Sequence, residues 1–312
     1  MNNIAFIFPG GGAQFVGMMK DICEKYPIAQ KTFDEADKIL GRSISGMTFA
    51  GEEEDLALIH NMQPCMLTAE IAAWRVLDSI GVKASMTAGF SLGEWTSLVV
   101  AGVLSYEQAL KLSQLRADYM RDSVQLGEGG MAVIFGKTEE QVLLLCEELG
   151  GISPSNYTCP GQVTVSGKLS SIKKLMEMKE REEIAAHQVL VDIPSHCELM
   201  RPASDKLAID INNVDINIPM IPIVMNVTAE ITNDLDTIKH NLITQLVKPV
   251  RFQQSIELML DNGINTFIEI GPGDILTRFV TKISKNKGLK TEALNVMDME
   301  TLEATLEYLK VH

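Results

Sequence analysis

A serine between two glycines, in the segment Gly89-Phe90-Ser91-Leu92-Gly93-Glu94, constrains the fold of this chain more than any other feature. The residues before it, 84–88, are small and mildly apolar, and the residues after it, 95–104, are mostly apolar and long enough for a helix. A serine at such a junction is typical of the Gly-x-Ser-x-Gly nucleophile elbow. The helix directs its unpaired amides at the serine, so we expect the Leu92 amide to receive the oxyanion of a tetrahedral intermediate. Because the same pattern also occurs by chance, other segments must decide whether it is catalytic.

Length and charge exclude several classes of protein. A chain of 312 residues fits one large domain, or one domain that carries a smaller one. A formal net charge of -14 argues against general binding of nucleic acid or of a membrane surface. The five cysteines form no metal-spaced pair and no even disulfide set, which predicts a reducing cytoplasm and no metal site.

The first strand is predicted at Ile4–Phe8, and it runs into the glycine-rich segment 10–12. A dinucleotide-binding loop would need a third glycine at position 15, where Phe15 stands. A glycine-rich turn also lets backbone amides approach a reacting atom closely. This turn therefore suits an oxyanion site better than a cofactor phosphate.

Several short motifs along the chain carry a resemblance to a known family. They are Phe8-Pro9-Gly10-x-Gly12-Ala13-Gln14, Gln63-Pro64, Gly89-x-Ser91-Leu92-Gly93-Glu94, Asn156-Tyr157-x-x-Pro160-Gly161-Gln162, Pro194-Ser195-His196, Gln245-Leu246-x-x-Pro249-Val250 and Glu269-Ile270-Gly271-Pro272-Gly273. In this order they resemble the malonyl-CoA:acyl carrier protein transacylases, the acyltransferases that load fatty-acid and polyketide synthases. The resemblance spans nearly the whole chain.

The pattern changes after the glycine-rich linker at 127–130. Strands are predicted at 131–135, 152–156, 162–166 and 187–193, with helices at 138–149 and 170–183. This is the split βαββαβ order of a ferredoxin-like unit. The predicted fold is therefore α/β, with a large α/β-hydrolase-like domain on a parallel sheet (residues 1–126 and 195–312) and an inserted ferredoxin-like small domain (residues 127–194). Members of the family are built in the same way.

A capping box at Ser105 and Gln108 predicts a helix whose inward face carries Arg116. An inward arginine needs a carboxylate, from the protein or from a substrate. From the pattern alone, an internal salt bridge or a snorkelling side chain explains Arg116 as well. The resemblance implies instead that Arg116 grips the free carboxylate of malonate.

A second candidate catalytic residue, His196, follows Pro194. The segment Ser195-His196-Cys197-Glu198 predicts a capping box that opens a helix. We expect His196 in the first turn of that helix, where the positive helix end keeps the imidazole neutral. The remaining histidines, at 60, 187, 240 and 312, lack such context and are interpreted as structural.

The resemblance implies a two-stage acyl transfer. His196 takes the proton of Ser91, which attacks malonyl-CoA, and the pantetheine thiol of an acyl carrier protein then accepts the malonyl group. The amides of Leu92 and Gly11 are expected to hold the oxyanion, and a backbone carbonyl near Gln245 to orient the histidine. Two positions depart from the family, which usually has glutamine at Gly11 and histidine at Phe90; the second puts the acyl specificity in doubt.

Two alternatives remain open from the sequence. An acyl hydrolase that removes acyl groups from carrier proteins of a polyketide synthase would share Ser91 and His196 but would have less use for Arg116. A non-catalytic subunit that docks carrier proteins would not need Ser91 and His196 together. We expect a cytoplasmic monomer without a cofactor of its own, whose partners are malonyl-CoA and an acidic carrier protein that brings the phosphopantetheine. Two basic clusters are candidates for carrier docking: Lys282, Lys285, Lys287 and Lys290, or Arg201 with Lys206.

Overall fold

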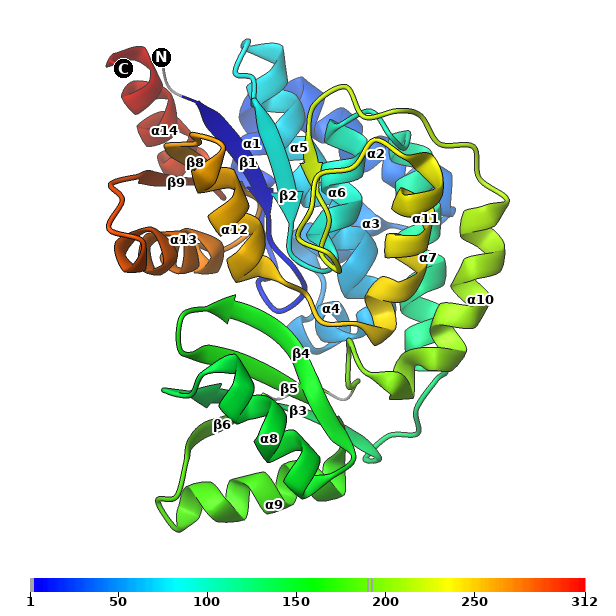
Figure 1. The fold of residues 1–312 in the computed structure, drawn as a ribbon. Helices are drawn as coiled ribbons and strands as arrows, with labels where there is room; N and C mark the ends of the chain where they lie inside the picture. The colour runs from blue at the N-terminus through cyan, green and yellow to red at the C-terminus, as the bar shows by residue number, and fades with distance from the viewer. Residues whose placement is uncertain (1–2, 190, 192, 312) are drawn as a thin grey trace.

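A computed structural model describes residues 3–189, 191 and 193–311 of the chain. Its larger part is built on a five-stranded sheet with the strand order β7-β2-β1-β8-β9, in which all neighbouring strands are parallel (Figure 1). The strands are β1 (Ile4–Phe8), β2 (Met86–Gly89), β7 (Ile223–Val224), β8 (Thr266–Ile270) and β9 (Glu292–Val296). The bounds of β1 and β8 are those that their apolar runs predict, because strands of a buried parallel sheet are apolar on both faces.

The two faces of this sheet are covered by different helices (Figure 1). On one face, Phe6 and Phe8 of β1 pack into the largest apolar cluster, whereas the alternate residues Ala5 and Ile7 pack into a second cluster on the other face. The first cluster draws on α1 (Lys20–Lys25), α2 (Pro27–Leu40), α3 (Ile44–Ala50), α4 (Glu53–Ala57), α5 (Ile59–Ser79), α6 (Gly93–Val100), α7 (Tyr106–Arg121), α10 (Arg201–Asn212), α11 (Leu235–Thr244) and α14 (Met299–Val311). The second draws on α12 (Phe252–Asp261) and α13 (Ile275–Asn286).

A separate antiparallel sheet has the strand order β4-β5-β3-β6. Its elements are β3 (Gly129–Phe135), α8 (Glu139–Leu149), β4 (Ile152–Cys159), β5 (Gln162–Lys168), α9 (Leu169–Glu180) and β6 (Ala185–Val189), all inside the predicted insertion 127–194. The predicted split βαββαβ order is confirmed, and α8 and α9 pack together beside this sheet (Figure 1). The last strand begins two residues before its predicted start at His187; of its predicted end, positions 190 and 192 lie outside the described residues.

Two elements of the larger part differ from what the sequence predicts, which is a helix at 66–77, after Pro64, and a strand at 221–226. The helix expected from residue 66 begins at Ile59 and contains Pro64 in its interior. The strand expected at 221–226 is only Ile223–Val224, so Asn226 lies in the turn after β7. A proline normally ends a helix because it lacks an N–H, so Pro64 in the interior of α5 is an exception.

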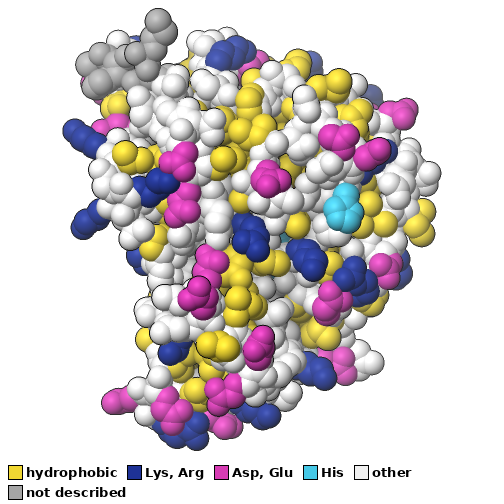
Figure 2. Space-filling view, viewed as in Figure 1, with side chains coloured by type: hydrophobic (Ala, Val, Ile, Leu, Met, Phe, Trp, Pro, Cys, Tyr) yellow, Lys and Arg dark blue, Asp and Glu magenta, His cyan; other side chains and the backbone are white. Residues whose placement is uncertain are grey.

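Backbone hydrogen bonds join β4 of the smaller sheet to Val250, which lies in the segment before α12 of the larger part. The Tyr157 N–H donates to the Val250 carbonyl at 2.9 Å, and the Val250 N–H donates to the Ser155 carbonyl at 2.8 Å. The Arg251 guanidinium lies 5.5 Å from the centre of the Tyr157 ring. On the face seen in Figure 2, acidic and basic side chains are interspersed over both parts of the molecule. Among the described residues, no helix is long and apolar enough to cross a membrane.

Candidate active site

The elbow after β2 places Ser91 at the carboxyl edge of the parallel sheet. Phe8 of β1 pairs with Gly89 of β2, so the loops after both strands meet at this edge. Ser91 holds a left-handed backbone conformation with a φ of 54°. A Cβ on Gly89 would overlap the backbone of Gly93, and a Cβ on Gly93 would overlap the Phe8 carbonyl, so this turn requires both glycines.

Asn226 holds the elbow in place. Its Oδ1 accepts a hydrogen bond from the Ser91 N–H at 2.8 Å, and its Nδ2 donates to the Gly89 carbonyl at 2.6 Å. The sequence prediction missed this residue. A polar residue directly after an apolar strand of a parallel sheet is the signal that could have found it, because sites gather where such strands end.

Ser91 and His196 form a hydrogen-bonded dyad. The Ser91 Oγ lies 2.8 Å from His196 Nε2, and His196 Nδ1 lies 2.7 Å from the backbone oxygen of Gln245. A carbonyl can only accept, so Nδ1 carries the proton and Nε2 is left to accept the hydrogen bond of the serine hydroxyl. His196 is buried, and burial, followed by the charge of Arg116, lowers its pKa to about 4.

The predicted helix around His196 was wrong. His196 has a φ of 61° and precedes a short 3₁₀ turn at Glu198–Met200, which Cys197 begins without a side-chain cap, and α10 starts at Arg201. The histidine therefore does not lie in a first helical turn. Its neutral state follows from burial and from Arg116 rather than from a helix dipole.

The Arg116 side chain extends from α7 to Ser91 and Gln245. Its Nη2 donates to Ser91 Oγ at 3.1 Å and to Gln245 Oε1 at 3.0 Å, and its Nη1 donates to Gln63 Oε1 at 2.8 Å. Arg116 is buried, its Nε has no hydrogen-bond partner, and no ion pair joins it to a carboxylate within residues 3–189, 191 and 193–311. The capping box that opens α7 is confirmed. The internal salt bridge that the sequence left open is not formed in this part of the chain.

Gln245 connects the members of the site. It begins a 3₁₀ turn at Gln245–Val247 and is fully buried. Besides its contacts to His196 and Arg116, its Nε2 donates to the Ser91 carbonyl at 2.9 Å and to Glu94 Oε2 at 2.6 Å. Sequence reasoning singled out Gln245 for its backbone carbonyl alone and missed this use of the side chain.

The two expected oxyanion donors come from the elbow itself and from the loop after β1, whose Gly10 lies against the Phe90 carbonyl. Leu92 is buried directly before α6, and Gly11 is exposed in the turn after β1. Within the described residues, neither backbone N–H donates to a protein acceptor. A Cβ on Gly11 would collide with the side chain of Met62, so a glutamine at this position would require Met62 to move.

Phe90 points toward apolar neighbours. Its ring makes an edge-to-face contact with Phe252, with ring centres 5.5 Å apart, and Phe252 contacts Phe279 in the same way at 6.2 Å. The ring of Phe90 thus belongs to the apolar cluster under α12 and α13. Its effect on acyl specificity stays a prediction.

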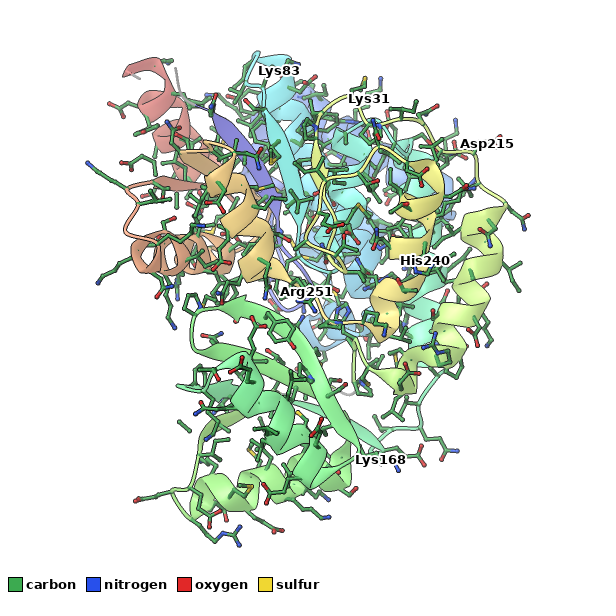
Figure 3. All side chains as sticks on the ribbon, viewed as in Figure 1. Lys31, Lys83, Lys168, Asp215, His240 and Arg251 are labelled. Atoms are coloured by element: carbon green, nitrogen blue, oxygen red, sulfur yellow. The ribbon has the colours of Figure 1, made fainter. Side chains whose placement is uncertain are left out.

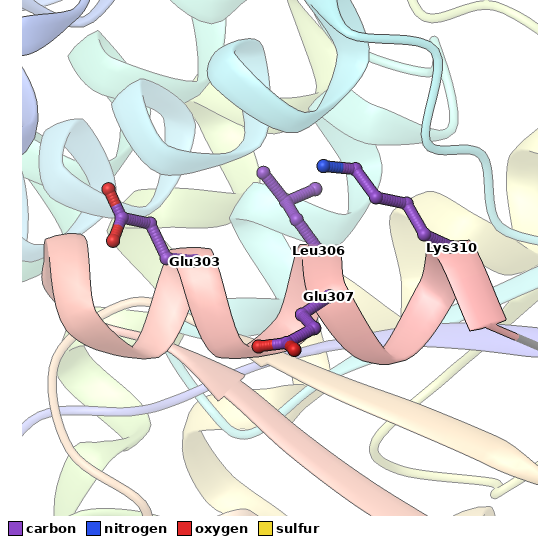
Figure 4. Close-up of a pocket in the computed structure, with 4 residues that line it drawn as sticks. All are labelled: Glu303, Leu306, Glu307 and Lys310. Atoms are coloured by element: carbon purple, nitrogen blue, oxygen red, sulfur yellow. The ribbon is translucent and has the colours of Figure 1, made fainter.

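Other features of the surface do not join this site. His240 is exposed on α11, and Figure 3 shows its position together with that of Arg251 at the junction of the two sheets. A shallow pocket on the C-terminal helix is lined by Glu303, Leu306, Glu307 and Lys310, all from α14 (Figure 4). No cluster of three or more potential metal ligands occurs among the residues that the structure describes.

Comparisons with known proteins identify the family of this chain. The family model described as the acyl transferase domain matches residues 5–304. The malonyl CoA-acyl carrier protein transacylase of Bacillus subtilis (strain 168) is 40% identical, over 99% of this chain and 98% of that protein. The structure of the same enzyme from Clostridium perfringens is 35% identical, with a TM-score of 0.94, and the alignment covers 99% of this chain and 97% of that one. A malonyl-transacylase solved in complex with a type II PKS acyl-carrier protein is also 35% identical, with a TM-score of 0.94 over 98% of this chain and 100% of that chain. The chain belongs to the acyl transferase domain family and, within it, to the malonyl CoA-acyl carrier protein transacylases.

Proposed function

We propose that this chain transfers a malonyl group from malonyl-CoA to the phosphopantetheine thiol of an acyl carrier protein, for fatty-acid or polyketide synthesis. The group passes through an ester on Ser91. The relatives reported above are named transacylases, and none of them is named a hydrolase. We place the reaction in the cytoplasm, which suits five free cysteine thiols.

In the first stage, His196 Nε2 takes the proton of Ser91 as Oγ bonds to the thioester carbon. The tetrahedral intermediate collapses, its carbon–sulfur bond breaks, and the coenzyme A sulfur leaves with the proton that His196 returns. In the second stage, the thiol of the carrier gives its proton to His196 and attacks the ester carbon. Ser91 leaves with that proton, and the enzyme returns to its starting state without a metal or a cofactor of its own.

The amides of Leu92 and Gly11 stabilise the negative oxygen of both tetrahedral intermediates. Their support is that Leu92 belongs to the elbow, that Gly10, next to Gly11, lies against the Phe90 carbonyl, and that neither N–H has a protein acceptor in the described part of the chain. A family glutamine at position 11 would supply the same backbone donor, which glycine keeps. Losing one such donor typically lowers the rate about 10²–10³-fold.

The buried guanidinium of Arg116 is the observation that carries the malonyl assignment. A buried arginine is costly unless a carboxylate pairs with it, and Arg116 has hydrogen bonds to Gln63, Gln245 and Ser91 but no ion pair in the described residues. Glu94 attracts this guanidinium from beyond Gln245 but does not contact it. A malonyl group on Ser91 brings a carboxylate that can contact it directly. Acetyl groups have none.

The nucleophile is tested by intact mass. After incubation with malonyl-CoA, the wild-type chain should gain one malonyl group on Ser91. Ser91→Ala should gain none while its circular dichroism stays unchanged, and His196→Ala should be acylated far more slowly. Acylation of the Ser91 variant at the wild-type rate would contradict the mechanism.

The substrate is tested by Arg116→Ala. This variant leaves the malonyl carboxylate desolvated and unpaired, at a cost of about 2–5 kcal/mol by analogy with truncated charge pairs. Acetyl-CoA should react no worse than with the wild type, so the preference for malonyl-CoA collapses. Arg116→Lys should recover only part of it, because lysine cannot form two parallel hydrogen bonds to a carboxylate. An unchanged ratio of the two rates would make Arg116 structural and would favour the hydrolase.

A further inference from the structure

The site contains one carboxylate that the mechanism above does not use. Glu94, in the first turn of α6, is fully buried. Its Oε1 accepts a hydrogen bond from the Asn226 N–H at 2.6 Å, and its Oε2 accepts one from Gln245 Nε2 at 2.6 Å. Glu94 therefore touches the two residues that hold the elbow and the histidine, and it does not contact Ser91 Oγ or His196.

Both partners of Glu94 are donors, and this favours its ionised form. A carboxylate accepts through both oxygens, whereas a neutral carboxyl group would have to donate one proton and finds no acceptor in either partner. Burial raises the pKa of Glu94 to about 7, and the hydrogen bonds from Asn226 and Gln245 act against that rise. An ionised fraction is thus available at neutral pH.

Gln245 lies between Glu94 and Arg116, and their charges fix the direction of its amide. The Glu94 carboxylate can only accept, so it bonds to the NH₂ group of the Gln245 amide, with Nε2 and Oε2 2.6 Å apart. The Arg116 guanidinium can only donate, so it bonds to the amide oxygen, with Nη2 and Oε1 3.0 Å apart. A flipped amide would set NH₂ against the guanidinium and oxygen against the carboxylate. The backbone carbonyl of the same residue accepts the His196 Nδ1–H.

We propose that Glu94 is a positioning residue that acts through Gln245. By holding the Gln245 side chain, it keeps one oxygen directed at Arg116 and the backbone carbonyl directed at His196. It touches no substrate atom. This assignment rests on the proposed function. Glu94 acts on the binding of the malonyl carboxylate by Arg116 and on the orientation of His196 as the general base.

The first test compares two buried carboxylates. Glu94→Gln keeps the shape of the side chain, but its amide has one accepting oxygen and one donating NH₂ group. Its two partners, the Asn226 N–H and Gln245 Nε2, are both donors, so one of the two hydrogen bonds must break. The preference for malonyl-CoA over acetyl-CoA, measured as the ratio of Ser91 acylation rates, should fall about 10- to 100-fold. Glu70→Gln is the matched control, since Glu70 is also fully buried and bonds to Thr96, away from Gln245. The control should keep the ratio within about 2-fold.

The second test asks whether Glu94 acts through Gln245. Gln245→Met removes the amide and keeps the backbone carbonyl, so it should lower the ratio on its own. Adding Glu94→Gln to it should change the ratio no further, because the contact is already gone. A further loss as large as in the wild-type background would overturn the proposal. If Glu94→Gln does not fold, Gln245→Met decides alone, and an unchanged ratio in that variant also overturns it.

Failure of this inference is distinct from failure of the proposed function. A wild-type chain that malonyl-CoA does not acylate removes the function. A wild-type chain that is acylated, with a Glu94→Gln variant that keeps the malonyl preference, removes only the role of Glu94.

Discussion

At the scale of single residues, Ser91 and His196 share an uncommon backbone conformation. Their φ angles of 54° and 61° lie in the left-handed region, which residues other than glycine adopt rarely. For Ser91, the two hydrogen bonds of Asn226 and the glycines on either side compensate for this. Both conformations serve to bring Oγ and Nε2 within 2.8 Å of each other.

The pH dependence of acylation should reflect the shifted histidine. Because burial and Arg116 lower the pKa of His196 from 6.5 to about 4, the imidazole stays a base well below pH 6. Glu94, whose pKa is raised to about 7, titrates separately, so the histidine is followed in the Glu94→Gln variant with acetyl-CoA. Its acylation rate, measured by stopped flow, should fall only near pH 4. Adding Arg116→Gln removes a positive charge and should raise this acid limb toward 6.5. A limb at 6.5 in Glu94→Gln alone would contradict the buried, neutral histidine.

The same shift affects stability. Between pH 6.5 and about 4 the unfolded chain binds a proton at His196 that the folded chain does not, so this residue lowers the free energy of unfolding as the pH falls through that range.

The sequence pointed to several of the polar residues that meet in the structure, but not to the hydrogen bonds that hold them there. Ser91, His196 and Arg116 stand out because glycine spacing, a strand end and an inward helix face are local patterns. Asn226 and the Gln245 side chain do not, because their partners are 135 and 154 residues away in the chain. The helix predicted around His196 was wrong for a related reason: tertiary contacts hold the histidine in a conformation that a capping box cannot form.

At the scale of elements, α5 shows how a helix accommodates an internal proline. Pro64 has no N–H, so the carbonyl of His60 loses its helical donor. The Arg42 side chain replaces that donor: Nη2 bonds to the His60 carbonyl at 2.6 Å, and also to Gln114 Oε1 on α7 at 2.7 Å. This contact explains how α5 continues on both sides of Pro64, although the sequence pattern placed the proline before the start of the helix.

Arg42→Met should therefore destabilise the chain by about 1.5–3 kcal/mol, the usual worth of hydrogen bonds to a charged group. Denaturant unfolding measures this change. Arg121→Met is the control, because the ion pairs of Arg121 with Asp118 and Asp122 lie at the surface and the substitution should change stability by less than about 1 kcal/mol. Equal effects of the two variants would show that the His60 carbonyl does not depend on Arg42.

Strand and helix prediction succeeded where one local signal dominated. The apolar run of β1 and the capping boxes of α7 and α8 gave the correct starts. Prediction of these elements failed where a side chain distant in sequence supplies a backbone hydrogen bond that the element itself lacks, as Arg42 does for the His60 carbonyl in α5.

At the scale of the whole molecule, the smaller sheet is hydrogen-bonded to a segment of the larger part that also contacts the site. Val250, which pairs with β4, lies five residues after Gln245, and the Arg251 N–H donates to the Asn226 carbonyl at 2.9 Å. The segment from Gln245 to Arg251 thus contacts the histidine, the elbow and the smaller sheet in turn. We expect the position of the smaller sheet to be fixed relative to Ser91 for this reason.

The surface of α13 borders this junction, since the helix contacts both β4 and β8. Lys285 on α13 and Lys290 after it are exposed, and neither has an ion pair within the described residues. Lys287, by contrast, pairs with Asp261 at 2.7 Å. In the alternative cluster, Arg201 pairs with Glu198 at 2.7 Å, and Lys206 lies 5.6 Å from the centre of the Tyr119 ring. Of the two candidate clusters, the one that contains Lys285 and Lys290 therefore has more positive charge that is exposed and unpaired among the described residues.

Because the chain carries a net charge of -14, an acidic carrier protein must dock where positive charge is locally exposed. Lys285→Glu with Lys290→Glu should slow malonyl transfer to the carrier about 10-fold at low salt and leave acylation by malonyl-CoA unchanged. The difference should shrink near 1 M salt, where the Debye length is about 3 Å. Arg201→Glu with Lys206→Glu is the matched pair of reversals and should have the smaller effect. Equal transfer rates for both pairs and the wild type would exclude both clusters as the docking surface.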